Sequence, residues 1–145
     1  MTDIEIRPMQ RSDIEEVVAI QQAITRKGES TPWKRMVEDY LDRSCDCCFV
    51  AHRGDEIIGC ILGDIKKWSF GLEKSGWIEV VGVSPKHMGE GVGKLLGEAL
   101  IDHFKEREIL NVYTSVAWDS GDMLAFFKSI GFKRSDFINL KCKLE

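Results

Sequence analysis

The stretch from Trp77 to Leu96, WIEVVGVSPKHMGEGVGKLL, decides the fold of this chain. It opens with β-branched residues, which favour a buried strand, and Pro85 ends that strand because proline has no N–H to donate to a ladder. Glycines follow at 89, 91 and 93, and apolar residues at helical spacing begin at Val92. The stretch therefore predicts a strand, a glycine-rich turn and the start of a helix.

The glycine-rich turn is suited to bind an anion such as phosphate. Glycine leaves backbone N–H groups accessible, and the N-terminus of the following helix adds unpaired N–H groups and a partial positive charge. A P-loop would need other residues in place of Met88 and Leu95, and a dinucleotide fingerprint would need glycine in place of Lys94. We therefore expect a phosphorylated ligand in a different kind of loop, with a tight turn that binds nothing as the alternative.

Two segments resemble the GCN5-related N-acetyltransferases. The first is the pattern Val-x-Val-x-Pro that ends at Pro85, together with the six residues from Met88 to Gly93, and it is similar to the acetyl-CoA loop of that family. Gly91 and Gly93 match the two diagnostic glycines of the loop, whereas Met88 replaces a Gln or an Arg. The second segment, residues 125–132 (AFFKSIGF), resembles the late helix of the family, which ends in Tyr-x-x-x-Gly-Phe.

The resemblance implies that acetyl-CoA is the co-substrate. The residues that it implies for cofactor binding are Val81, Gly82, Val83, Met88, Gly89, Glu90, Gly91, Val92, Gly93, Lys94, Ser120 and Phe127. Ser120 stands where the family has an asparagine, and Phe127 stands where the family has the tyrosine that acts as general acid. Because a phenyl ring cannot donate a proton, we expect Phe127 to pack beside the pantetheine arm instead.

Glu79 is the candidate general base, because a carboxylate in an otherwise apolar strand is costly to bury unless it is paired or functional. Strict alternation would place it on the same face as Val81 and Val83. Partial burial would increase its tendency to take a proton from an ammonium group. The alternative is a glutamate at the end of the strand that faces solvent or pairs with a lysine. Tyr113 is the candidate replacement for the missing acid, with a packing role as the alternative.

Composition limits the function further. The chain has 145 residues, 43% of them hydrophobic, which suffices for one domain with a sizeable core. Its net charge of −4 disfavours nucleic acid as a partner, and no apolar run reaches membrane-spanning length. The five cysteines include Cys45, Cys47 and Cys48 but lack the spacing of a zinc site. We therefore expect no metal, no membrane partner and reduced thiols in the cytoplasm.

Hydrophobic periods outline the rest of the chain. They predict strands over 4–7, 47–53, 57–65, 111–117 and 137–143, and helices after Ser12, from Thr31, from Val92 and over 123–130. Ser12 and Glu15 indicate a capping box at the start of the first helix. Residues 66–76 are expected to form a connection near the substrate. Trp33 is expected either in the core or in the lining of a substrate groove. This order predicts a three-layer α/β/α sandwich with a mixed, mostly antiparallel sheet. The resemblance implies the acyl-CoA N-acyltransferase fold.

These observations together predict one N-acetyltransferase domain over residues 1–145. It would transfer an acetyl group from acetyl-CoA to a primary amine of a small molecule or a peptide. The alternative is an acyl-CoA-binding sensor or partner module with little or no turnover, which Met88 and Phe127 favour. The sequence does not identify the acceptor, and it leaves the oligomeric state open, a homodimer included.

Overall fold

A five-stranded sheet is the central element of this protein, whose structure is a computed structural model. The structure describes residues 3–25, 31–67, 74–117 and 119–144. The chain divides into two compact units, residues 1–115 and residues 116–145. The elements are, in order, β1 (Glu5–Pro8), the 3₁₀ turn η1 (Arg11–Asp13), α1 (Ile14–Thr25), α2 (Thr31–Ser44), η2 (Cys45–Cys47), β2 (Cys48–Arg53), β3 (Glu56–Lys67), β4 (Lys74–Val83), η4 (Pro85–His87), α3 (Val92–Glu106), β5 (Val112–Thr114) and α4 (Gly121–Ser129).

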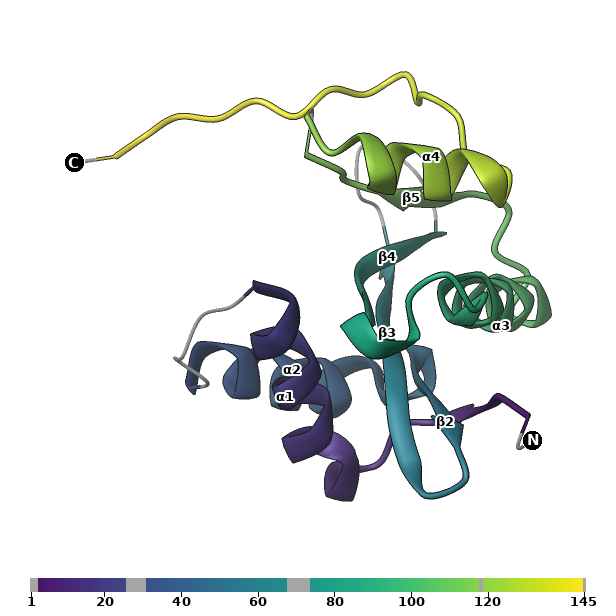
Figure 1. Ribbon diagram of the computed structural model, residues 1–145. Coiled ribbons are helices and arrows are strands. Elements are labelled where there is room, and N and C mark those ends of the chain that lie inside the picture. Colours follow the sequence, from purple (N-terminus) through teal and green to yellow (C-terminus); the bar gives the residue numbers. More distant parts are fainter. Residues whose placement is uncertain (1–2, 26–30, 68–73, 118, 145) are drawn as a thin grey trace. The chain divides into compact units, whose positions relative to one another are not determined.

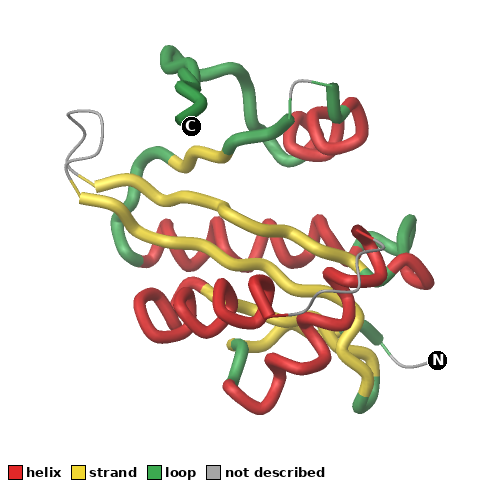
Figure 2. The backbone as a smooth tube through the Cα atoms, turned by 90° about the vertical axis from the view of Figure 1, so that its left-hand side faces the viewer, coloured by secondary structure: helices red, strands yellow, loops and turns green. Residues whose placement is uncertain are grey.

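The strands lie side by side in chain order, β1-β2-β3-β4-β5. The first four strands pair antiparallel with their neighbours, and β5 lies parallel to β4. The β3–β4 ladder is the longest and forms the two long yellow strands of Figure 2. The mixed, mostly antiparallel sheet that the sequence predicts is confirmed.

Helices cover both faces of this sheet (Figure 1). Neighbouring residues of β3 define the two faces, because successive side chains of a strand point to opposite sides. Cys60 packs in a core cluster with Val17 of α1 and Val37 of α2. A side chain at Gly59 would instead point at Val92 of α3. Helices α1 and α2 therefore form one outer layer and α3 forms the other, which confirms the predicted three-layer sandwich.

Two glycines let α3 lie close to the sheet. A Cβ at Gly63 would lie 2.7 Å from a methyl group of Leu100, and a Cβ at Gly76 would lie 2.7 Å from the ring of Phe104. Carbon atoms pack best at about 3.5–4.0 Å, so a larger residue at either position would push the helix away. Leu100 and Phe104 are fully buried, and this side of the sheet is a close-packed core.

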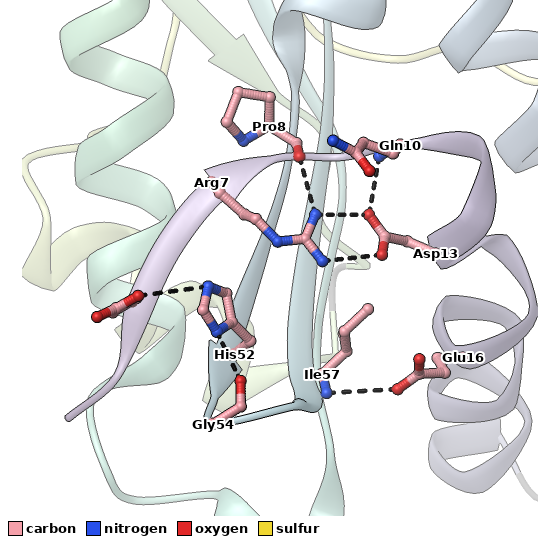
Figure 3. A network of polar contacts seen from close by, with 9 residues as sticks. Arg7, Pro8, Gln10, Asp13, Glu16, His52, Gly54 and Ile57 are labelled. Atoms are coloured by element: carbon pink, nitrogen blue, oxygen red, sulfur yellow. Dashed lines mark hydrogen bonds and ion pairs between the residues drawn. The ribbon is translucent and has the colours of Figure 1, made fainter. Parts of the chain in front are cut away.

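The entry into α1 is organised by a network of polar contacts around Asp13 (Figure 3). Arg7 donates two hydrogen bonds to the Asp13 carboxylate, at 2.8 and 2.9 Å, and the Gln10 N–H donates a third at 2.8 Å. The hydrogen bonds from the Arg7 guanidinium hold the pKa of Asp13 below its usual value. The predicted capping box of Ser12 and Glu15 is therefore wrong. Ser12 lies inside η1, because the carboxylate one residue later binds both the turn and an arginine of β1.

Three predicted boundaries need correction. Both ends of the expected 66–76 connection belong to the β3–β4 ladder, because β3 continues to Lys67 and β4 already begins at Lys74. Trp68, Phe70 and Leu72 lie outside the described residues. The fifth strand spans three residues, Val112–Thr114, instead of the predicted seven-residue span 111–117.

The predicted last strand, 137–143, is wrong within the described part of the chain, where the sheet consists of β1 to β5. Ile138 and Leu140, whose alternation suggested a strand, are 70% and 88% exposed. Alternation supplies a row of apolar side chains, but a strand also needs a neighbouring edge to form a ladder.

The C-terminal unit contains α4 and a small aromatic cluster. Phe127 is buried, and its ring meets Phe126 and Phe132 edge to face, with centroids 5.1 and 5.2 Å away. Gly131 has a left-handed φ of 105° just after the helix, as the sequence predicts for a helix end. Among the helices in the described ranges, none is long and apolar enough to cross a membrane.

Candidate active site

Strand β4 separates from β5 after Ile78. The parallel ladder joins only Gly76–Ile78 to Val112–Thr114, and at its end Thr114 Oγ1 donates to the Ile78 carbonyl at 2.8 Å. On its other side, β4 stays paired with β3 as far as Val83. Beyond Ile78, one edge of β4 therefore has no strand beside it in the residues that the structure describes. Such an edge can bind an extended ligand through its backbone groups.

A β-bulge lies at the same point. In the β3–β4 ladder Leu62 pairs with Val80, whereas Gly63 pairs with Ile78. Glu79 is thus one extra residue on β4. Because bulges re-aim side chains and sharpen the local twist, the direction of the Glu79 side chain cannot follow from simple alternation.

The bulge turns Glu79 toward the α1–α2 face. Burial raises the pKa of the Tyr40 phenol in α2, and the nearby charge of Glu79 adds to that rise. Gly82 faces the same way, since a Cβ there would lie 3.4 Å from an isoleucine of α1. Val81 and Val83 therefore point to the opposite face. The expectation that Glu79 shares a face with Val81 and Val83 is wrong, because the extra residue shifts the alternation.

The Glu79 carboxylate forms an ion pair with a lysine of the neighbouring strand. Lys66 Nζ lies 3.1 Å from Glu79 Oε1, and the two side chains are 39% and 25% exposed. The same ammonium group lies 4.3 Å from the centroid of the Trp77 ring. A carboxylate and an aromatic face thus share one cation. Pairing with a lysine is the arrangement that the sequence left open as the alternative to a role as base.

Tyr113 joins this group through Trp77. The two rings stack, with centroids 5.1 Å apart and an interplanar angle of 27°, as expected of residues that pair across the β4–β5 ladder. Lys66, Trp77, Glu79 and Tyr113 are named the Glu79 cluster below. The structure therefore brings the two predicted catalytic residues, Glu79 and Tyr113, into one cluster.

Sequence reasoning missed two members of this cluster, Lys66 and Trp77, and one neighbour, Tyr40. Lys66 lies in the stretch assigned to a connection, and only the ladder register that pairs it with Ser75 shows where it points. Tyr40 follows the apolar spacing of α2, so the sequence alone shows no sign of a functional role for it. Burial and the nearby charge of Glu79 raise the pKa of its phenol, which is protonated at neutral pH as phenols ordinarily are and so can donate a hydrogen bond. Trp33, for which a groove and the core were both open, is half-buried and packs against the core cluster on this face.

The glycine-rich turn has the backbone conformation that a phosphate loop requires. Gly89 and Gly91 both have φ of 83°, a left-handed conformation that favours glycine, and a Cβ on either would meet nothing within 4 Å. The first hydrogen bond of α3 runs from the Leu95 N–H to the Gly91 carbonyl at 3.1 Å. The N–H groups of Val92–Lys94 therefore have no acceptor within the helix, and with the open turn they suit an anion.

Side chains tie this turn to the β2–β3 hairpin. Glu90 accepts a hydrogen bond from Arg53 at 2.8 Å, and its other carboxylate oxygen lies 3.2 Å from His87 Nδ1. The hydrogen bond from Arg53 lowers the pKa of the Glu90 carboxyl. The Glu90 side chain is thus already engaged, while Met88 and Lys94 have exposed side chains. The contacts of these residues with a cofactor stay predictions.

Ser120 and Phe127 lie in the C-terminal unit. The Ser120 carbonyl accepts from the Leu124 N–H at 3.0 Å at the start of α4, and its hydroxyl caps no N–H of the helix. Phe127 is 5% exposed within the aromatic cluster described above. Their predicted contacts with acetyl-CoA stay predictions.

One group of potential metal ligands lies apart from the Glu79 cluster. Asp46, Cys47 and His103 each place one ligand atom within 4.8 Å of the others. Asp46 is already bound by Arg107 and His103. Burial raises the pKa of the Cys47 thiol to about 12, which opposes the thiolate form that binds metals. The expectation of no metal stays a prediction.

Comparison with known proteins gives a family match. Residues 14–132 match the model of the acetyltransferase (GNAT) family. The chain is 30% identical to a mycothiol acetyltransferase of Renibacterium salmoninarum over 103 residues, which cover 71% of this chain and 30% of that protein. It is 34% identical to a mycothiol acetyltransferase of Kocuria rhizophila over 80 residues, which cover 55% of this chain and 26% of that protein. The chain thus spans less than a third of the length of the curated relatives it matches.

Solved structures share the fold over nearly the whole chain. The aminoglycoside N-acetyltransferase AAC(6')-Iy, solved in complex with CoA, aligns with a TM-score of 0.83 and 15% identity, covering 99% of this chain and 96% of the other. Ard1 from Thermoplasma volcanium aligns with a TM-score of 0.79 and 22% identity, covering 91% of this chain and 84% of the other. At these identities the likeness concerns the fold alone.

Proposed function

Because the chain belongs to the acetyltransferase (GNAT) family, we propose that it transfers the acetyl group of acetyl-CoA to a primary amine. The observation that carries the proposal is the separation of β4 from β5 at Ile78, a few residues before the glycine-rich turn. An extended thioester arm fits beside a free strand edge, and a pyrophosphate fits at the N-terminus of the helix that follows.

The residues present fit acetyl-CoA. The open space at Gly89 and Gly91, which a Cβ would fill, allows a phosphate to approach the backbone closely. When bound, acetyl-CoA supplies an activated thioester. Backbone N–H groups of 81–83 would donate to its carbonyl oxygen and stabilise the charge that develops there.

Glu79 has the role of general base in this proposal. Its carboxylate takes a proton from the acceptor ammonium, directly or through one water, and the free amine then attacks the thioester carbon. The thiol leaves with little help, because free thiols titrate near pH 8.5, only about one to two units above neutrality. A phenolic acid is therefore not essential, which fits Phe127 at the position where the family has a tyrosine. Tyr113 and Tyr40 are the phenols that remain for this role.

The acceptor in this proposal is a primary amine of a small molecule or a peptide. Relatives named for mycothiol, and fold neighbours named for aminoglycosides, make small-molecule amines the first compounds to test. We also propose that residues 1–145 act as one domain, since the family match includes residues from both compact units. A homodimer, which the sequence left open, stays a prediction.

Release of free thiol from acetyl-CoA tests the proposal. A panel of a polyamine, an amino acid, a peptide N-terminus and an aminoglycoside would be compared with acetyl-CoA alone. We expect at least one amine to accelerate thiol release and to appear acetylated by mass spectrometry. Tight binding of acetyl-CoA by calorimetry without acceleration by any of these classes would count against the proposal.

The second candidate is an acyl-CoA-binding module with little or no turnover. Two observations favour it: Glu79 is paired with Lys66, and Phe127 cannot act as an acid. The thiol-release experiment separates the two candidates, because both predict acetyl-CoA binding and only the first predicts an acetylated product.

A further inference from the structure

We propose that the ammonium group of Lys66 occupies the position of the acceptor's ammonium group, so that Lys66 leaves the Glu79 cluster when an amine binds. This inference rests on the proposed function and adds a substrate class to it. The acceptor would bind as a cation, with its ammonium group between the Glu79 carboxylate and the face of the Trp77 ring.

The cluster has the two parts of a cation site. Glu79 Oε1 lies 3.1 Å from the Lys66 nitrogen, which is an ion pair. The Trp77 ring centroid lies 4.3 Å from the same nitrogen, within the range of a cation–π contact. The ring is held in place, because its indole N–H donates to Ser75 Oγ at 2.9 Å and its face stacks on Tyr113. A cation that binds here meets a preformed site.

Lys66 is a replaceable occupant of this site. Its backbone is fixed in the ladder opposite Ser75, but its charge lies at the end of a flexible four-carbon stem and its side chain is 39% exposed. Ion pairs with this much exposure contribute little stability, so the ammonium can swing into solvent at small cost. The backbone would not need to move.

The exchange would also prepare Glu79 for its role as base. While the ion pair lasts, the Glu79 carboxylate faces the Lys66 ammonium group and not an acceptor. When an acceptor ammonium takes the place of Lys66, the charge of the site is unchanged, but the proton of the bound cation is now the one to be removed. A neutral molecule in the same place would lack the attraction of the Glu79 carboxylate and of the Trp77 ring face for a positive charge. The site therefore selects cations over neutral molecules of the same shape.

Binding measurements with simple probes test this inference. The Trp77 indole N–H gives a signal in proton–nitrogen NMR spectra that Trp77→Phe would assign. Butylammonium would be titrated against the parent, Lys66→Met and Lys67→Met, with butanol as the neutral probe of the same shape. Lys67 is the matched control, because it is exposed and points to the opposite face of β3. Thermal unfolding and circular dichroism would establish that each variant is folded, and Lys66→Gln would serve as a second variant.

We expect butylammonium to bind Lys66→Met about 3- to 10-fold more tightly than the parent, as removal of a weak competing ion pair and cation–π contact should allow. Butanol should leave the Trp77 signal unshifted, Lys67→Met should match the parent, and Glu79→Gln should abolish the shift. Equal affinity for parent and Lys66→Met would overturn the inference. So would weaker binding of γ-aminobutyrate to Lys66→Met than to the parent, because Lys66 would then stay and bind an acceptor carboxylate.

The failure of this inference and that of the proposed function are separable. Tighter cation binding in Lys66→Met without thiol release by any amine would retain the cation site and reject the transferase. Amine-dependent thiol release with unchanged cation affinity would retain the transferase and reject the role of Lys66.

Discussion

The two halves of β4 differ in how they are held. Residues 74–78 all pair with β3, and the last three of them also pair with β5. The ring of Phe104 lies directly above Gly76. In the described part of the chain, Glu79 bulges out of the ladder and residues 80–83 pair with β3 alone. Gly82 has only ordinary contacts around it. The first half is closed by packing, whereas the second has a backbone edge and a carboxylate that the ladder does not use.

This difference indicates how the strand divides its roles. Changes at the positions of the first half that face the core should lower the free energy of unfolding and leave chemistry alone. Trp77 is the exception, because its ring faces Lys66 in the Glu79 cluster. Changes in the second half should affect binding or rate and leave folding nearly unchanged. The predictions below test that division.

The largest effect is expected for Glu79→Gln, which keeps the shape of the side chain and removes its basicity. General base catalysis is worth about 10²–10⁴-fold, so kcat should fall by that factor, while the midpoint of thermal unfolding should barely change because exposed ion pairs add little stability. Steady-state kinetics and thermal unfolding check both parts. An unchanged kcat would assign Glu79 to a purely structural ion pair.

A smaller effect on binding is expected for Gly93→Val, just beyond the second half. A β-branched side chain there should block the approach of the pyrophosphate to the first turn of α3. The loss of one or two charge-assisted hydrogen bonds corresponds to a fall in acetyl-CoA affinity of roughly 10- to 100-fold. Gly93 suits this test better than Gly91, whose left-handed φ of 83° would add backbone strain.

Gly93→Ala is the matched control for this calorimetric titration. Alanine adds one methyl group and no β-branch, so Gly93→Ala should keep most of the affinity. If Gly93→Val bound acetyl-CoA as tightly as the parent does, the turn would not be the site.

Gly76→Ala and Gly82→Ala compare the two halves with the same chemical change. At Gly76 the new methyl group would lie 2.7 Å from the Phe104 ring, and overpacking of this kind costs about 1–3 kcal/mol of unfolding free energy. At Gly82 the contacts start at 3.4 Å, so Gly82→Ala should stay within about 1 kcal/mol of the parent. Denaturant unfolding measures both values. Equal losses for the two variants would contradict the division between the halves.

The smallest effect is an alkaline titration that reports the direction of Glu79. The chain has two tyrosines, so Tyr113→Phe leaves Tyr40 as the only phenol to titrate. Burial and then the charge of Glu79 raise the pKa of Tyr40 above its usual 10.0. The stability that protonated Tyr40 contributes is therefore fully present below pH 10.0, its usual pKa, and is lost as the pH rises through the raised pKa of the folded state.

Adding Glu79→Gln to the Tyr113→Phe background should lower the pKa of Tyr40, because it removes the charge that is one of the two main causes of the raised pKa. The absorbance of tyrosinate measures this pKa. A titration midpoint that does not move would mean that Glu79 does not face α2.

The elements that depend on local pattern were predictable from the sequence. The strand, turn and helix between Trp77 and Leu96 follow from β-branched residues, glycines and a helical period that are all local, and the structure has each of them. The need for glycine at 89 and 91 likewise follows from their positive φ.

The features that depend on contacts between distant segments were not predictable. Ser12 does not cap α1, because the turn before the helix is organised by Asp13, whose carboxylate binds an arginine of β1 and the Gln10 N–H. The side of the sheet to which Glu79 points depends on a register shift between β3 and β4. The sequence of β4 alone does not reveal that shift. Residues 137–143 would likewise need a neighbouring strand to form a ladder, and the sequence of this segment does not show whether one is present.

The extra residue in β4 has a consequence for how this chain can change. Leu62 and Gly63 are adjacent in β3, and their partners in β4, Val80 and Ile78, are separated only by Glu79. Deleting that single residue would join the two registers into one regular ladder, and every other side chain of β4 would keep the face it has now. The carboxylate is in this sense an insertion into a strand that is complete without it. Insertion or deletion of a single codon could therefore add or remove the Glu79 carboxylate during evolution, without repacking of the core on either face of the sheet.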